Sequence, residues 1–120
     1  MNASRFAAGQ VWRYRTRPGE EGSRAIVGRV ETDDEGEVIV HVKLTHLRMV
    51  TPHAPEGYYP SLSHIPVAEE SFADSITAPL AESPDLAEFE DGYRMWIENQ
   101  GGVFTISLAE IVEFTEQALQ

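Results

Sequence analysis

Residues 9–31 read GQVWRYRTRPGEEGSRAIVGRVE, and this stretch decides how the chain folds. Polar and apolar side chains alternate through residues 10–16, with the period of two that is typical of a half-buried β-strand. A proline and two glycines in residues 17–23 predict a connection, and residues 25–32 supply a second strand. The stretch therefore predicts a β-hairpin.

Three residues of this hairpin have a predicted place. The alternation puts Trp12 and Tyr14 on the face opposite Arg13, so both aromatic rings should lie in the core. Gly28 stands in the middle of the second strand, where a glycine marks a bulge or the close approach of another backbone or side chain.

A third strand follows the polar turn at residues 33–37. Residues 38–44 form the clearest strand, with an apolar face of Val38, Val40, Val42 and Leu44, whereas Ile39, His41 and Lys43 lie on the other face. Three consecutive strands with short connections predict an antiparallel meander. Residues 51–67, TPHAPEGYYPSLSHIPV, then lose all periodicity and hold four prolines. We expect a long packed loop there, because structureless loops of this length are uncommon in small domains unless they are functional or disordered.

The rest of the chain predicts three helices and one more strand. A first helix is expected over residues 66–77, and a second should be capped by Ser83 and end at Gly101. Within this second helix, Gly92 indicates close packing against a neighbour. Residues 103–106 predict a short fourth strand.

The last helix has the clearest start signal in the chain. Ser107 and Glu110 have the spacing of a capping box, in which each side chain bonds the other's backbone N–H group. The helical period turns Ile111 and Phe114 toward the core.

These elements predict a single α+β domain covering residues 1–120. We expect a small, mainly antiparallel sheet of about four strands with an N-terminal three-stranded meander, covered by two or three helices. A partly open barrel is the alternative form of this sheet. No apolar stretch approaches the ~18 residues of a membrane span, and the chain has no cysteine, so we expect a cytoplasmic protein.

Charge is distributed unevenly along the chain. Residues 1–29 contain six arginines and two glutamates, whereas residues 30–120 contain three cations and 18 acids, and the formal net charge is -11. Binding to nucleic acid depends on basic residues that displace counterions, so this composition disfavours a nucleic-acid partner.

The arginines of the hairpin allow two interpretations. In the first, Arg13, Arg15 and Arg29 neutralise acidic helices of the same chain. In the second, Arg15 and Arg17, beside Glu20, bind an external carboxylate or phosphate, for which the guanidinium group has a matching fork of donors.

The long loop supplies the other candidates. His53 and His64 could act as acid–base groups or metal ligands, or serve simply as hydrogen-bonding loop residues. Tyr58 could form the lip of a binding site or pack on the sheet. No metal-binding, nucleophile-elbow or phosphate-loop motif is present, so we assign no catalytic residue, metal or cofactor. The candidate ligand-binding residues are Arg15, Arg17, Glu20, His53, Tyr58 and His64.

The runs GQVWRYRTRPGEEGS at residues 9–23 and GGVFTIS at residues 101–107 resemble a family of small bacterial proteins to which no activity is assigned. The intervening TPHAPEG and SHIP segments are similar too, so the resemblance covers most of the chain, but it implies no catalytic residue. At the level of fold, the strand–loop–strand opening is also similar to the growth-inhibiting endoribonucleases of toxin–antitoxin pairs. Those proteins usually have Asp where Gln10 stands here.

We therefore expect a non-enzymatic binding or interaction module, present as a monomer or homodimer. Its partner would be a protein or a small anionic ligand that binds at the loops of residues 17–23 and 51–67. The alternative is a small hydrolase that uses His53 and His64 in the long loop.

Overall fold

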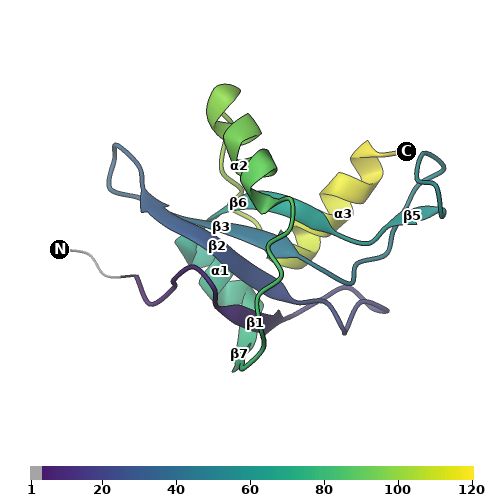
Figure 1. Ribbon diagram of the computed structural model, residues 1–120, viewed down its shortest axis with the longest axis horizontal. Helices are drawn as coiled ribbons and strands as arrows, with labels where there is room; N and C mark the ends of the chain where they lie inside the picture. Colours follow the sequence, from purple (N-terminus) through teal and green to yellow (C-terminus); the bar gives the residue numbers. More distant parts are fainter. Residues whose placement is uncertain (1–3) are drawn as a thin grey trace.

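The computed structural model describes residues 4–120 and shows an open, five-stranded antiparallel sheet with helices on both faces (Figure 1). The strands of this sheet, in the spatial order β6-β3-β2-β1-β7, are β1 (Val11–Tyr14), β2 (Ala25–Thr32), β3 (Val38–Leu44), β6 (Leu62–Ala68) and β7 (Ile76–Leu80). The remaining elements are β4 (Met49–Val50), β5 (Tyr58–Tyr59), α1 (Glu69–Ser75), α2 (Phe89–Glu98) and α3 (Leu108–Ala118). Strands β4 and β5 form a separate antiparallel pair.

The predicted fold class and the N-terminal meander are confirmed, since β2 pairs antiparallel with both β1 and β3. The sheet has five strands rather than about four, and it is open, so it is not a barrel. None of the helices in residues 4–120 is long and apolar enough to cross a membrane.

The main core lies between one face of the sheet and the helices α1 and α3. The predicted apolar face of β3 contributes Val40, Val42 and Leu44, which are fully buried, and α1 inserts Phe72 among them. Helix α3 buries Leu108, Ile111 and Val112. Each such side chain stabilises the fold by roughly 1.5–3 kcal/mol through removal of apolar surface from water.

Predictions about single residues of this core have mixed outcomes. Tyr14 is buried in the core, and Trp12 is half-buried against it, as predicted. The capping box of Ser107 and Glu110 is present with both of its bonds. Phe114 was predicted to point inward and is instead exposed, with its ring packed edge-on against that of Phe104.

Helix α2 covers the opposite face of the sheet, and two glycines set its distance. A Cβ atom added to Gly28 would lie within 2.6 Å of three atoms of the Phe89 ring, and the β2–β3 register shifts at this glycine. A Cβ atom on Gly92 would lie 2.7 Å from the Cβ atom of His64. The close approaches predicted at both glycines are confirmed.

Three predicted element boundaries are wrong. The long loop at residues 51–67 contains β5 and most of β6, because residues 62–68 pair with β3 although they include Pro66. The first helix begins only at Glu69, and its expected end continues as β7, which carries Pro79 at the edge of the sheet. Proline is tolerated in edge strands because its missing N–H faces away from the ladder.

The second helix and the fourth strand also differ from the prediction. Helix α2 begins at Phe89 rather than beside Ser83. It follows Glu88, whose φ angle of 68° lies in the left-handed region. Residues 103–106 form no strand and contribute only a single parallel bridge from Phe104 to Val67.

Candidate functional site

Arg17 is the centre of an ion-pair network that joins the hairpin loop to α3. Its Nε and one terminal nitrogen donate to Glu20 at 2.9 and 2.8 Å, and the other terminal nitrogen donates to Glu113 and Glu116 at 3.1 and 2.9 Å. The remaining hydrogen goes to the carbonyl oxygen of Arg48 at 3.2 Å. A guanidinium group has five N–H donors, and all five are used here. We call this network the Arg17 clasp.

The electrostatics of the Arg17 clasp disfavour an external anion. Its hydrogen bond to Glu20 raises the pKa of Arg17 despite partial burial, and Arg17 in turn lowers the pKa of Glu116. Glu20 is only 3% exposed and also accepts the backbone N–H of Arg48 at 2.6 Å. Three carboxylates around one guanidinium leave a net negative charge, which repels a second carboxylate or a phosphate. Arg15 lies outside this network, with an exposed side chain.

The hairpin loop and the start of the long loop meet at Arg48. Its carbonyl accepts from Arg17, and its guanidinium carbon lies 4.6 Å above the centre of the Tyr58 ring. His53 is exposed in the turn between β4 and β5, which is tied to the end of α3 by a 2.8 Å bond from Thr51 Oγ1 to the Leu119 carbonyl. The structure thus places Arg17, Glu20 and Tyr58 around one junction, with His53 farther along the loop.

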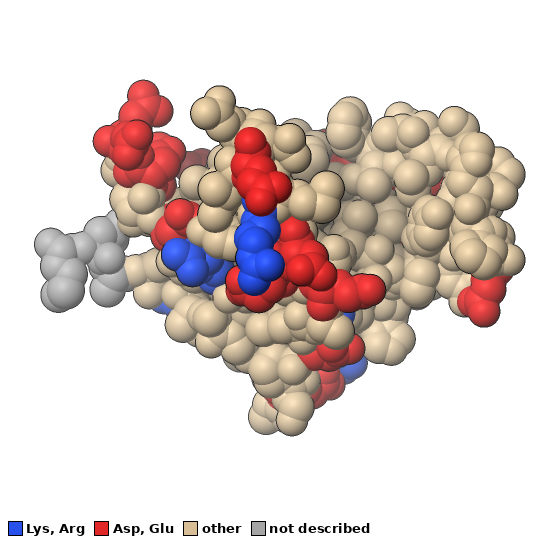
Figure 2. All heavy atoms as spheres, turned by 45° about the horizontal axis from the view of Figure 1, so that its top comes forward, with Lys and Arg blue, Asp and Glu red and all other residues tan. Residues whose placement is uncertain are grey.

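The residues of β4, β5 and their connection contribute almost no charge to the surface, although the exposed Arg48 beside them lies over the Tyr58 ring. Between Met49 and Ala68 the only ionised side chain expected at neutral pH is Glu56. Figure 2 shows this region in the right-hand part of the face, which is tan apart from acidic atoms at its lower right edge and contrasts with the acidic side chains gathered around α2 at the centre. Val50, 52% exposed, and the half-buried Tyr58 belong to it. We call the surface of residues 49–62 the charge-poor face.

His64 lies apart from the other candidates, in a polar cluster under α2. Its Nε2 atom is 2.8 Å from Nδ1 of the fully buried His41. The other ring nitrogen of His41, Nε2, lies 2.8 Å from Glu31 Oε1, at ion-pair distance but without the alignment of a regular hydrogen bond. Tyr93 donates its hydroxyl to the same Glu31 oxygen at 2.8 Å.

Burial keeps both histidines of this cluster neutral. It lowers the pKa of His41, and together with the neighbouring His41 it lowers the pKa of His64 to about 4. A neutral His41 that turns its Nε2–H toward Glu31 must accept at Nδ1, so His64 donates from Nε2. Burial and the bond to Glu31 also raise the pKa of Tyr93.

Aromatic rings from α2 close over this cluster. The Trp96 ring packs edge-on against the His41 ring, with 4.7 Å between the ring centres. The Phe89 ring packs in the same way against the His64 ring, with 5.5 Å between the centres. The arrangement therefore fastens α2 to the sheet. His53 and His64, the pair that the hydrolase alternative combines, lie in different surroundings, one in an exposed turn and the other beneath α2.

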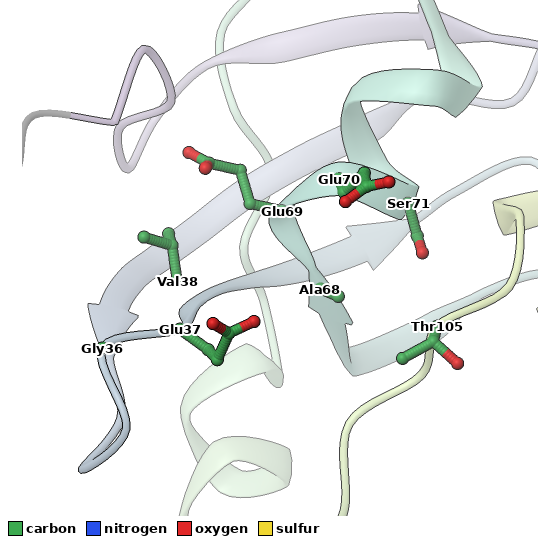
Figure 3. Close-up of a pocket in the computed structure, with 8 residues that line it drawn as sticks. All are labelled: Gly36, Glu37, Val38, Ala68, Glu69, Glu70, Ser71 and Thr105. Carbon is green, nitrogen blue, oxygen red and sulfur yellow. The ribbon is translucent and has the colours of Figure 1, made fainter.

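A cavity of about 420 Å³ lies between the turn before β3 and the start of α1. Three carboxylates line it, from Glu37, Glu69 and Glu70. Figure 3 shows the carboxylates of Glu69 and Glu70 pointing in opposite directions, and Glu69 accepts a hydrogen bond from Ser4. Among residues 4–120, no three histidine, aspartate or glutamate side chains are gathered as a metal ion requires.

Sequence reasoning missed His41 and Lys43 as partners in a buried polar face. Lys43 is buried and donates to the Ala87 carbonyl at 3.0 Å. The sequence signal for this buried face was the pair of glycines Gly28 and Gly92, which both lie where α2 packs on the sheet.

No family model matches the chain, and no curated protein or solved structure is similar to it. The site must therefore be interpreted from its own geometry.

Proposed function

We propose that this protein is a non-enzymatic binding module that engages a protein partner through the charge-poor face. The observation that carries the proposal is the contrast between this face and the rest of a chain with a formal net charge of -11. Interface centres are depleted in charged residues and enriched in aromatic ones, and this face offers Tyr58, Tyr59 and the exposed Val50.

A protein partner is favoured over a small anionic ligand. Arg17, the only arginine of the loop at residues 17–23, has all five donors bound to Glu20, Glu113, Glu116 and the Arg48 carbonyl. The exposed Arg15 is the other candidate cation beside this loop. An anion at Arg17 would have to displace these partners and would leave the buried Glu20 carboxylate without a cation.

Site-specific photo-crosslinking in the native cells tests the proposal. A benzophenone-bearing residue placed at Val50 or Tyr58 should give one discrete adduct, and the same residue at the exposed turn position Glu35 should not. A Val50→Asp substitution should weaken the adduct formed from position 58, because it puts a charge at the centre of the contact. The same adducts from all three positions, or none from positions 50 and 58, would contradict the proposal.

A further inference from the structure

An apolar groove of about 360 Å³ lies beside the C-terminal end of α2. Its lining consists of Pro66, Trp96, Gly102, Val103 and Phe104. The charge-poor face adjoins the start of β6, whereas Pro66 belongs to the last part of that strand. The groove is therefore a second surface, at the other end of β6.

Both walls of the groove are held by hydrogen bonds. On one side Trp96 Nε1 donates to the Gly102 carbonyl at 2.8 Å, and the Gly101 N–H donates to the Trp96 carbonyl at 2.9 Å. On the other side Phe104 is bonded to β6. Its N–H donates to the Pro66 carbonyl, and its carbonyl accepts from the Ala68 N–H, each at 2.9 Å. A site that is already formed loses little entropy when a partner binds.

Exposed apolar side chains adjoin this groove. Val103 is 37% exposed, and Phe104 meets the 57% exposed Phe114 with 6.2 Å between ring centres. A contiguous apolar surface of this kind, bordered by polar residues, marks an interaction site more often than chance exposure.

The lining of the groove is uncharged, but the part of the chain that supplies it is strongly acidic, which favours a basic partner. From Met49 to Gln120 the chain holds 13 acidic residues and one basic residue, Arg94. Helix α2 has no basic residue in its last turn, where Glu98 adds to the negative end of the helix dipole. A nucleic acid would be repelled, and a second copy of this chain would set one acidic surface against another.

We propose that this groove binds a segment of a partner protein in which an aliphatic or aromatic side chain is flanked by lysine or arginine. The apolar side chain enters between Trp96 and Val103, and the cation lies toward Glu98 and the carbonyl end of α2. The groove supplies the buried contact, and the acidic surroundings supply attraction and orientation.

Selection from a displayed library of random dodecapeptides tests this proposal. The immobilised full chain should enrich peptides with an apolar residue next to lysine or arginine. A Val103→Asn variant should bind the enriched peptides about tenfold more weakly, and Glu98→Gln should weaken binding roughly threefold with a smaller dependence on salt. The matched control, Val50→Asn, makes the same exchange on the charge-poor face and should leave this binding unchanged.

The variants separate this groove from the proposed function. Three results would contradict the proposed binding in the groove. They are enrichment of peptides without cations, equal binding of the enriched peptides to Val103→Asn and to the parent chain, and no enrichment at all. Loss of peptide binding in Val50→Asn alone would also contradict binding in the groove. It would instead support the charge-poor face as the surface that binds the peptide. Thermal unfolding of each variant checks the fold, and Val103→Thr, which keeps the side-chain shape, serves if Val103→Asn unfolds.

Discussion

Gly28 sets the distance between α2 and the sheet. The absent side chain leaves room for the Phe89 ring, which covers the strand at a place where any Cβ atom would overlap three of its atoms. Phe89 is almost fully buried in this contact. The packing is therefore a direct consequence of one missing methyl group.

We predict that Gly28→Ala destabilises the protein by about 1–3 kcal/mol, because the added methyl forces the Phe89 ring and α2 away from the sheet. The measurement is urea unfolding followed by circular dichroism. Gly22→Ala is the control, since a Cβ atom there meets nothing within 4 Å and should leave the midpoint nearly unchanged. Equal midpoints for both variants would refute the account of Gly28.

At the scale of single residues the sequence predicted positions but not partners. Gly28 and Gly92 could be singled out because glycine is costly inside a strand or helix, so each needs a packing reason. His41 could be placed on the outer face of β3 by its period, but its contact with His64 joins residues on two strands. That contact depends on β6, which was not predicted as a strand because it contains Pro66.

The element most dependent on charge is α3. It carries Glu110, Glu113 and Glu116 without any lysine or arginine, and the Arg17 clasp supplies the missing cation from the hairpin loop. Glu116 also accepts the N–H of Val50 at 2.6 Å. The network thus holds α3, β4 and the hairpin loop together.

Arg17→Met should destabilise the protein by about 3 kcal/mol, because it leaves the buried Glu20 carboxylate without its cation. Arg15→Met removes an exposed arginine two residues away and should change stability by less than about 0.5 kcal/mol. Chemical unfolding of the two variants measures the difference. If both lost the same amount, the clasp would contribute nothing beyond a surface charge.

The start of α3 gives a second prediction at the scale of elements. Ser107→Ala removes the side chain that accepts from the Glu110 N–H and should cost about 1 kcal/mol in the free energy of unfolding. Ser83→Ala is the matched control, because Ser83 has a capping sequence but lies exposed before a helix that begins at Phe89. A loss at Ser83 equal to that at Ser107 would show that the sequence signal, and not the observed start of α2, is right.

Edge elements were the hardest to predict. β2 has the bounds predicted for the second strand, and β3 follows its predicted apolar face. β6 and β7 contain Pro66 and Pro79, which in isolation argue against a strand. β6 and β7 are the two edge strands of the sheet, where proline is tolerated. The order of the strands cannot be predicted from the local sequence pattern.

For the whole molecule, charge separates the two ends of the sheet. Most arginines lie in the N-terminal strands and their connections, whereas the β6 end adjoins two acidic helices. The charge asymmetry was visible in the sequence. The charge-poor face is one continuous stretch, so its low charge was visible too, although its pairing of β4 with β5 was not. The apolar groove was not visible, because it is assembled from Pro66, Trp96 and residues 102–104, which are distant in the chain.

The neutral histidine pair makes the stability of the whole molecule depend on pH. In the folded state the pKa values of His41 and His64 lie below the usual 6.5, and that of His64 is about 4. As the pH falls below 6.5, the unfolded chain takes up protons that the folded chain does not bind. The free energy of unfolding must therefore decrease with falling pH, by linkage.

We predict this decrease between pH 6.5 and pH 5, with at most one proton taken up per histidine. The window lies above the range where Glu110 and Glu116 titrate, because their pKa values are lowered below the usual 4.5, so these two carboxylates contribute little to the slope. Urea unfolding at several pH values measures it. His64→Gln keeps a donor for His41 and should reduce the slope to the part that His41 contributes, whereas His53→Gln changes only an exposed turn and should leave the slope unchanged. A slope that persists in His64→Gln and disappears in His53→Gln would place the titration in the loop instead of under α2.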